Sequence, residues 1–473
     1  MKPKPTFREV ADPGRREALG ALAGAAGAAV LPWPAQAGAT RPRVGIVGGG
    51  MAGVACAWLL DGACDVVLFE AAPSIGGNVR TVDVVAEGHP YRVDMGAQYF
   101  HPGPYPHYVE LLTQLGLYPD STGGSHAFPA SITLADPSEG TPRFVSPVLP
   151  GRAWPLLAPW NRAGVQAFNK AFSAARRREE QDASWLLTLG EWLPTLGLSP
   201  AQWEGMLLPW AASLHHGDIA AAAGISARAA MVFAAKALPE RLTDPILYHV
   251  LEHGMIDALD RMVAQLTTAQ LHTAAPVTAV SRLPQGGFGL LAAGGQQAVV
   301  DALVFAASGE PTVQLMAALS GTAAQRAALG AIEFFDTRIV LHADPGYAAA
   351  DPRMRSFLNC QVQGPFCEAS MALADVLTPA PGAAAPPKLW KSWATHRPPP
   401  SQVLAEAQFR HVLSSPKSIL AQDALRPLQG QGGVWIAGGY TQPYDSQESA
   451  LLSAMAVADG ILAAAGLRQR RLA

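Results

Sequence analysis

The run Gly48-Gly49-Gly50-Met51-Ala52-Gly53 has the glycine spacing that binds the phosphates of a dinucleotide. It follows a β-branched segment, Arg43–Val47, and precedes Val54–Leu60, whose apolar residues have helical spacing. In such a strand–turn–helix unit the first glycine makes the tight turn, the second lets a pyrophosphate approach the backbone, and the third lets helix pack on strand. The pyrophosphate then lies at the helix N-terminus, where free N–H groups and the helix dipole favour an anion.

An acidic residue and a second glycine pair follow this turn at spacings that favour contacts with the same dinucleotide. The apolar segment Asp65–Phe69 predicts a second strand, and Glu70 comes 22 residues after Gly48. A carboxylate at this position binds the ribose hydroxyls of an adenosine and repels a 2′-phosphate. Gly76 and Gly77 complete an E-x5-G-G spacing and precede Asn78, so their backbone can approach the same cofactor from another side.

The next segment points to a flavin. Val93–Phe100 is typical of a strand and turn that would bring Gly96, Ala97, Gln98 and Tyr99 against an isoalloxazine ring. The N-terminal segments together resemble the flavin-containing amine oxidase superfamily, which includes carotenoid desaturases, renalase-like proteins and uncharacterised NAD/FAD-binding oxidoreductases. Asn78, where amine oxidases often have arginine, brings the chain closest to the uncharacterised branch.

A second motif near the C-terminus supports the resemblance. A predicted strand within Gly433–Tyr440 ends in Gly438 and Gly439, and Glu448-Ser449-Ala450 opens a helix that continues to Leu462. The superfamily's closing motif is similar, with E-G-A at the helix start. The resemblance implies that this N-terminus faces the flavin's pyrimidine edge, where the helix dipole stabilises negative charge at N1 and O2. Because no cysteine lies near this motif, we expect non-covalent FAD.

The resemblance also implies a discontinuous domain organisation within an α/β fold. A Rossmann-type FAD-binding domain would comprise residues 41–110, 250–310 and 425–467, and it would be interleaved with an α+β substrate domain at 111–249 and 311–424. Within the FAD domain, Val277 of the predicted strand 276–280 would present backbone to the adenine.

The substrate segments divide by pattern into helices and strands. Apolar spacing predicts helices at Trp185–Leu193, Ala201–Leu214 and Ala220–Ala237, and strands at Thr337–His342 and Lys388–Trp393.

Relatives often use one lysine to hold water near flavin N5, and this chain offers few lysines. Only Lys388 and Lys391 lie in a strand-like run before the closing motif. Strand alternation points their side chains to opposite faces, so at most one faces the flavin. We predict Lys391, between Trp390 and Trp393, as the catalytic lysine. The alternative is a lysine that lies over aromatic surface with its charge in water.

Other residues depart from the family pattern. Relatives carry an aromatic residue two positions before the closing glutamate, and here that position is Ser446, although Tyr440 and Tyr444 are near in sequence. His215-His216 with Asp218 lacks a third ligand at metal-binding spacing, so we expect a polar helix end and no metal site. Buried free thiols are expected for Cys56 and Cys64, whereas the state of Cys360 and Cys367 is open.

Composition excludes other classes. With 34 Lys and Arg against 37 Asp and Glu, the net charge of −3 offers no footprint for nucleic acid. The body of the 473-residue chain contains no continuous apolar span of about 20 residues, which excludes a helical membrane protein.

The N-terminal segment, residues 1–37, is typical of an export signal. Arg15-Arg16 precedes a weakly apolar stretch and the small-residue site Ala35-Gln36-Ala37. We expect twin-arginine export to the periplasm, with the mature chain at net charge −5 because the segment carries five basic and three acidic residues. A disordered tail or short buried helix is the alternative. Residues 468–473 would form an exposed basic tail.

We therefore expect an FAD-dependent oxidoreductase acting on a C–N or C–C bond of a small, partly apolar substrate. Oxygen or another acceptor would reoxidise the flavin, and the sequence leaves the oligomeric state open. The alternatives are a desaturase or isomerase acting on a lipid or polyene, and a flavin-binding protein without turnover.

Overall fold

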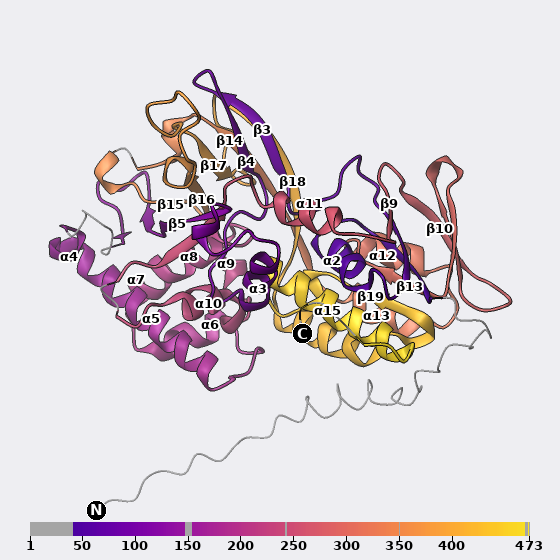
Figure 1. The fold of residues 1–473 in the computed structure, drawn as a ribbon. Coiled ribbons are helices and arrows are strands. Elements are labelled where there is room, and N and C mark those ends of the chain that lie inside the picture. Colours follow the sequence, from indigo (N-terminus) through magenta and orange to yellow (C-terminus); the bar gives the residue numbers. More distant parts are fainter. Residues whose placement is uncertain (1–40, 147–153, 242–243, 350, 469–471, 473) are drawn as a thin grey trace, which may run out of the picture.

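The computed structural model describes residues 41–146, 154–241, 244–349, 351–468 and 472. The predicted export segment at 1–37 lies outside the described residues, as does most of the predicted basic tail. Two layered regions lie side by side in Figure 1, and the long strands β14 (Phe334–His342) and β18 (Val403–Val412) belong to one of them.

A five-stranded parallel sheet carries the first glycine motif. Its strands come from both ends of the chain, in the order β19 (Val434–Ile436), β13 (Ala302–Phe305), β1 (Arg43–Val47), β2 (Asp65–Phe69) and β9 (Gln270–His272). The central strand β1 is buried from Val44 to Val47. This continuous apolar run is what a parallel sheet covered on both faces requires.

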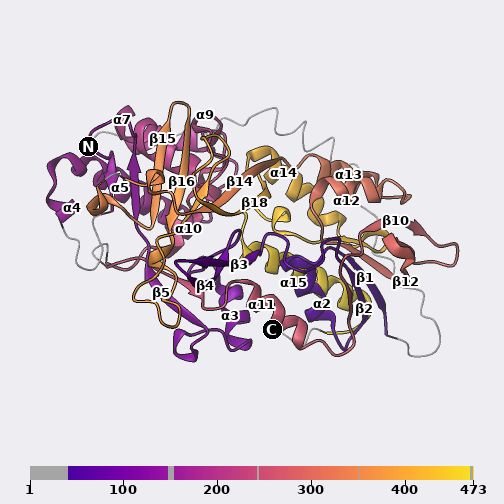
Figure 2. The same ribbon diagram turned by 90° about the horizontal axis from the view of Figure 1, so that it is seen from above.

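Two layers of helices cover this sheet. On one face lie α2 (Met51–Leu60), α11 (Ile256–Ala264) and α15 (Gln447–Ala464). Small residues bring α2 and α15 together, and the Cys56 Sγ lies 3.7 Å from the carbonyl oxygen of Ala454. The other face packs against α12 (Gly309–Met316), α13 (Ala323–Gly330) and α14 (Pro416–Leu425), which lie across the sheet from α2 and α15 in Figure 2.

A small antiparallel sheet of β10 (Val277–Arg282), β11 (Phe288–Ala292) and β12 (Gln297–Val300) is inserted before β13. The pairing of β10 and β11 is irregular between Val277 and Ala279, and Val277 is half-buried.

The second region is built on a seven-stranded mixed sheet. Its order is β18, β14, β17 (Trp390–Trp393), β16 (Phe366–Ala372), β15 (Leu358–Gln363), β6 (Ile132–Ala135) and β7 (Phe144–Val145). Only β15 and β6 run parallel among these pairs. Two hairpin-like pairs flank it, β3 (Thr81–Ala86) with β4 (His89–Asp94) and β5 (Ser125–Pro129) with β8 (Leu247–Leu251).

Helices pack on the seven-stranded sheet, and several are shorter than the apolar pattern predicts. The longest are α5 (Arg162–Glu180), α8 (Leu208–Ser213) and α10 (Ala227–Ala237). The predicted helix at 185–193 is wrong in extent, because Thr188 caps the single turn Leu189–Trp192 and Pro194 follows.

The other two predicted helices are also interrupted. The segment 201–214 contains a π-helical turn, Trp203–Leu207, just before Pro209, which has no N–H to donate to the helix. The segment 220–237 breaks at Ser226, whose side chain caps α10 by accepting from the Ala229 N–H.

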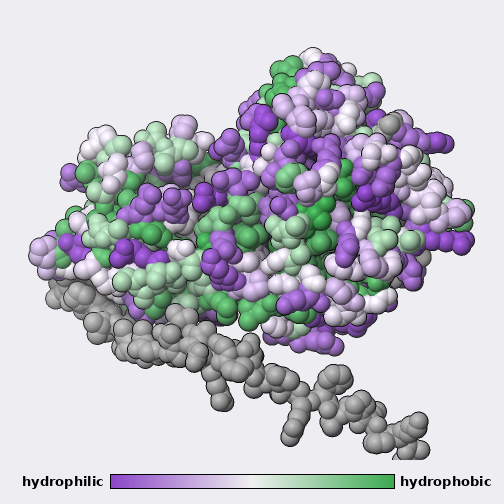
Figure 3. Space-filling view, turned by 180° about the vertical axis from the view of Figure 1, so that it is seen from behind, coloured by the Kyte–Doolittle hydropathy of each residue, from purple (hydrophilic) through white to green (hydrophobic). Residues whose placement is uncertain are grey.

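The surface mixes polar and apolar residues. Figure 3 shows hydrophilic and hydrophobic side chains interspersed over the face seen from behind. Within the described ranges no helix is both long and apolar enough to span a bilayer. All four cysteines are buried free thiols, which settles Cys360 and Cys367: they lie on neighbouring strands without forming a disulfide.

Candidate active site

The first glycine turn leaves the N-terminus of α2 open. Gly48 has φ +115°, and a Cβ there would lie 2.7 Å from the Ala306 backbone. A Cβ on Gly53 would lie only 1.9 Å from the Gly48 oxygen, so only glycine lets the helix start against the turn. No side chain caps the helix at Gly50, and its first turn, with Met51 and Ala52, therefore presents free N–H groups.

The acid at the end of β2 is fixed beside this turn. Glu70 accepts hydrogen bonds from the Gly49 N–H at 2.6 Å and from the Ala72 N–H at 2.7 Å. Each bond uses one carboxylate oxygen, and each oxygen keeps a further lone pair. Glu70, which is predicted to bind the ribose hydroxyls, is thus held in place and can still accept hydrogen bonds from them.

The second glycine pair packs directly on the first. The Gly76 N–H donates to the Gly49 oxygen at 2.9 Å, and a Cβ on Gly77 would lie 3.1 Å from the Gly50 Cα. Around Gly50, by contrast, a Cβ would meet nothing closer than 3.8 Å. The two turns form a backbone cradle with open space at its centre, which fits a pyrophosphate-containing cofactor.

The predicted flavin loop lies next to this cradle. The Ala97 N–H donates to the Asn78 oxygen at 3.0 Å, and a Cβ on Gly96 would lie 2.0 Å from that same oxygen. Gln98 is 6% exposed, and its Oε1 has no partner among the described residues. The Tyr99 ring packs edge-on against Phe128, Tyr248 and Phe357.

Lys391 joins the second sheet to this loop. Its side chain is 1% exposed, and Nζ donates to the Gly96 oxygen at 3.1 Å. Lys388 is exposed instead and precedes β17, so the structure brings only Lys391 of the two to the loop.

Burial sets the charge of Lys391 and of its acidic neighbour. Burial lowers the pKa of Lys391 to about 7, and the nearby Asp94 carboxylate opposes this shift. Burial raises the pKa of Asp94 to about 6, against hydrogen bonds from Thr81 Oγ1 at 2.5 Å and the Met255 N–H. Burial and the mutual attraction of the two groups therefore act in opposite directions on the charge of each.

The glutamate of the closing motif bonds to another helix of the protein. Glu448 is 1% exposed and caps α3 (Pro106–Gln114), accepting from the N–H groups of His107 at 3.2 Å and Tyr108 at 2.8 Å. The His107 Nδ1 is 2.6 Å from the same carboxylate. Glu448 therefore anchors α3 with its side chain, and it contributes only backbone to the start of α15.

Serine replaces the expected aromatic residue because the position caps a helix. Ser446 caps α15 by accepting from the Ser449 N–H at 3.0 Å, and the Ala450 N–H bonds back to the Ser446 oxygen. The Tyr440 hydroxyl donates to the Ala307 oxygen at 3.0 Å. Tyr444 packs between Trp185 and Phe233.

Gly438 and Gly439 connect β19 to this helix. The Gly438 N–H donates to the Ser453 Oγ at 3.0 Å, and a Cβ on Gly439 would lie 3.1 Å from an oxygen of Asp445.

The sequence did not single out Asp445, its partner His411, or Phe409. The His411 Nδ1 lies 2.8 Å from Asp445 Oδ2, and the Phe409 ring borders Gly96. Alternation along Val403–Val412 would have placed His411 and Phe409 on one face, but only the fold shows what that face meets.

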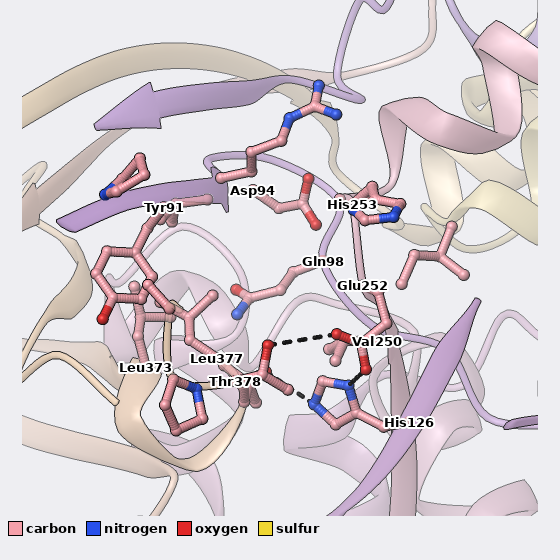
Figure 4. Close-up of a pocket in the computed structure, with 18 of the residues that line it drawn as sticks. Tyr91, Asp94, Gln98, His126, Val250, Glu252, His253, Leu373, Leu377 and Thr378 are labelled. Carbon is pink, nitrogen blue, oxygen red and sulfur yellow. Dashed lines mark hydrogen bonds and ion pairs between the residues drawn. The ribbon is translucent and has the colours of Figure 1, made fainter. Parts of the chain in front are cut away.

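A pocket of about 260 Å³ borders the flavin loop and is lined in part by Gln98 (Figure 4). The Gln98 amide points into it, and Asp94 also lines it. Across the pocket, His126 Nδ1 lies 2.6 Å from Glu252 Oε1. In the part of the chain that the structure describes, no cluster of His, Cys, Asp or Glu could hold a metal ion, and the His216 Nδ1 only accepts from the Asp218 N–H.

Solved structures share this fold at low sequence identity. A protein assigned as protoporphyrinogen oxidase from Exiguobacterium is 15% identical with a TM-score of 0.61, covering 90% of this chain and 99% of its own. Putrescine oxidase bound to putrescine is 15% identical with a TM-score of 0.62 and the same coverage.

A fatty acid isomerase from P. acnes is 13% identical with a TM-score of 0.61, covering 87% of this chain and 97% of its own. These likenesses confirm the predicted mixed α/β fold. No curated protein matches in sequence.

The family model described as flavin containing amine oxidoreductase matches residues 51–328, more than half of the chain. This range contains the second glycine pair, the loop at 96–99 and the inserted sheet. The predicted resemblance is thereby confirmed, and with it the FAD cofactor that the glycine cradle fits. The chain belongs to the flavin containing amine oxidoreductase family and is an FAD-dependent oxidoreductase.

Proposed function

We propose that this enzyme oxidises the C–N bond of a small, partly apolar amine or amino acid. FAD would accept a hydride at N5 and pass its electrons to O2 or another acceptor. The observation that carries the proposal is the buried Lys391, whose Nζ bonds to the Gly96 oxygen in the predicted flavin loop.

The described residues offer a binding role for each part of FAD. The open N-terminus of α2 would hold the pyrophosphate and Glu70 the ribose hydroxyls. Backbone at Val277 would face the adenine. The loop Gly96–Tyr99 and the first turn of α15 would flank the ring system. The five-stranded parallel sheet would then be the core of a Rossmann-type domain, interleaved with the substrate domain along the boundaries expected above.

We propose that FAD binds non-covalently, and the positions of the thiols support this. Cys56 lies within α2, and Cys360 and Cys367 lie on β15 and β16. Burial raises the pKa of Cys56 and of Cys360 to about 12, so these thiols stay protonated and unreactive.

Lys391 would position a water molecule and a proton beside the reacting carbon. A lysine whose pKa lies near 7 is neutral part of the time, so Nζ can accept a hydrogen bond as well as donate one. The nearby Asp94 carboxylate would favour the protonated form of Lys391 and so oppose the effect of burial.

The test is anaerobic flavin reduction in the purified yellow protein, followed by loss of the visible flavin absorption across amines, amino acids and polyenes. We expect amines or amino acids to bleach the flavin, and Lys391→Met to slow bleaching by about 10²-fold or more. Lys388→Met is the matched control on the exposed lysine and should bleach at the wild-type rate. Bleaching by polyenes alone would instead establish the lipid alternative, and no bleaching would overturn catalysis.

We further propose that residues 1–37 direct twin-arginine export to the periplasm. Arg15 and Arg16 provide the paired arginines, and cleavage would follow Ala37. Replacing both arginines with lysine should retain the full-length protein in the cytoplasmic fraction, whereas the wild-type chain should appear in the periplasm without residues 1–37. Equal distribution of both forms would contradict the proposal.

A further inference from the structure

A histidine on the long strand β18 lies on the face of that strand that borders the predicted flavin loop. His411 pairs in register with Phe335 of β14. Two residues earlier on the same face, the Phe409 ring would lie 3.0 Å from a Cβ on Gly96. On the neighbouring strand β14, Thr337 pairs in register with Phe409. Thr337 is buried, and its Oγ1 has no hydrogen-bond partner among the described residues. This face of the sheet therefore carries a polar group that has no hydrogen-bond partner among the described residues.

The closing motif approaches His411 from the other side. Asp445 lies just before the cap of α15, and its Oδ2 is 2.8 Å from the His411 Nδ1. Its other oxygen lies 3.1 Å from where Gly439 would carry a Cβ. The carboxylate thus spans from the glycine pair of the closing motif to the imidazole.

The second glycine segment completes the arrangement. The Asn78 Nδ2 donates to the Arg410 oxygen at 3.4 Å, directly before His411 in the chain. His411 therefore lies where the segments at 76–78, 96–99 and 438–450 meet. The last two are the segments to which we assign the flavin ring, and the first belongs to the adjoining cradle for the pyrophosphate.

The pair has the form of an oriented base. Because Nδ1 bonds to the carboxylate, the imidazole carries its proton there and leaves the Nε2 lone pair free. Nε2 makes no hydrogen bond to any residue that the structure describes. The side chains of His411 and Asp445 are 27% and 34% exposed, so a small molecule can approach them.

The other titratable groups around His411 are uncharged or point away from it. The Asp445 carboxylate is therefore the main charge near the imidazole. His215 lies in the turn after α8, and burial with two neighbouring imidazoles lowers its pKa to about 4, so it is neutral. Burial raises the pKa of Tyr105, which precedes α3, so its hydroxyl stays protonated. His216 contacts Phe335, and burial lowers its pKa as well. Arg410 points to the opposite face, toward Glu310 and Asp336.

We propose that His411, oriented by Asp445, is the base that accepts a proton from the substrate's ammonium group before oxidation. This inference rests on the proposed amine oxidation and names the group that prepares its substrate. Amines arrive as ammonium ions at neutral pH, and the ammonium has no nitrogen lone pair to stabilise the cation that forms when hydride leaves. In the step, one N–H bond of the ammonium breaks and one Nε2–H bond forms. The product is a neutral amine, and the Asp445 carboxylate stabilises the imidazolium until its proton passes to water.

The first test is the pH profile of anaerobic flavin reduction in the FAD-loaded enzyme. At neutral pH, His411→Asn should slow reduction by about 10²-fold or more, and Asp445→Asn by about 10-fold. Both variants should recover toward the wild-type rate above the pKa of the substrate amine, because the solution then supplies neutral amine. A role limited to structure would lower the rate equally at every pH, and that outcome overturns the proposal.

His126→Gln is the matched control. His126 pairs with Glu252 at 2.6 Å in the same histidine–carboxylate geometry, but it lies across the pocket that borders the flavin loop. This variant should keep the wild-type rate and pH profile. Loss of the pH profile in His126→Gln as well would show that the effect is not specific to His411, and it would also overturn the assignment.

A second readout needs no substrate. The absorption bands of oxidised FAD should lie at different wavelengths in wild type and in His411→Asn, because the substitution replaces a polar ring beside the flavin. His126→Gln should keep the wild-type bands. If no amine reduces the wild-type flavin, the proposed function fails, and this spectrum still decides whether His411 lies at the ring. Identical spectra in wild type and His411→Asn overturn the inference.

Discussion

The two sides of the candidate site are assembled in opposite ways. On the nucleotide side, the key contact joins Glu70 to Gly49, only 21 residues apart. On the substrate side, Lys391 meets Gly96 across 295 residues, and Glu448 meets His107 across 341. The first side is made of glycine backbone, whereas the second depends on buried charged side chains from distant segments.

This difference determines which kind of substitution disrupts each side. A backbone cradle fails when an atom is added, because nothing in it can move aside. A set of buried charges fails when a group is removed or its protonation changes, because the remaining partner is left without compensation. The variants below test this contrast.

Gly53→Ala should have the largest effect and would break the nucleotide side. The new Cβ would lie 1.9 Å from the Gly48 oxygen, which forces α2 away from β1. We expect at least about 100-fold weaker FAD binding, equivalent to about 2.7 kcal/mol, measured by flavin titration of the apoprotein. Gly330→Ala in α13 meets no atom within 4 Å and should bind FAD normally. Normal flavin content in Gly53→Ala would contradict the cradle.

Lys391→Met tests the substrate side through stability. The pKa of Lys391 falls from 10.5 when unfolded to about 7 when folded. The unfolded chain therefore binds more protons between pH 7 and 10.5, and the free energy of unfolding should rise with pH across this window. Urea unfolding should show that rise, of a few kcal/mol, in wild type and Lys388→Met but not in Lys391→Met. Equal slopes in all three proteins would contradict a neutral, buried Lys391.

Glu448→Gln should destabilise the junction between the two sides. An amide keeps one oxygen as acceptor but sets its NH2 group against the N–H donor of either His107 or Tyr108. We expect a loss of about 1–3 kcal/mol in denaturant unfolding. Glu406→Gln, at an exposed pair with Arg338, should leave stability close to that of the wild type, because water and salt screen such a pair. Equal losses would show that Glu448 contributes no more than a surface residue.

Ser446→Ala should have the smallest effect. It removes the oxygen that accepts from the Ser449 N–H at the start of α15. A loss of about 1 kcal/mol is expected, and Ser446→Asn should restore most of it because asparagine caps equally well. If Ser446→Asn and Ser446→Ala unfold alike, the side chain does not act as a cap.

The sequence predicts the nucleotide side well, for a physical reason. Gly48, Gly53 and Glu70 act through local backbone geometry, so their spacing alone specifies the turn. Strand alternation predicted that at most one of Lys388 and Lys391 faces the flavin, and the structure places only Lys391 beside Gly96. Its catalytic role stays a prediction.

The rest of the site depends on tertiary packing. Nothing near Glu448 in the sequence shows that its carboxylate caps α3, and nothing near His411 shows that Asp445 is its partner. The interrupted helices did carry local signals, since Thr188 and Ser226 are capping residues within apolar runs. The continuous apolar pattern outweighed those signals in the prediction.

The strand order of the parallel sheet has a consequence for synthesis. β1 pairs with β13, which in turn pairs with β19, and β19 lies about 390 residues after β1. At about 5–20 residues per second, the first glycine turn leaves the ribosome roughly 20–80 s before the last strand exists. Chains truncated before β19 would lack one edge of the sheet and all of α15. We therefore expect stable binding of the nucleotide only once the polypeptide is complete.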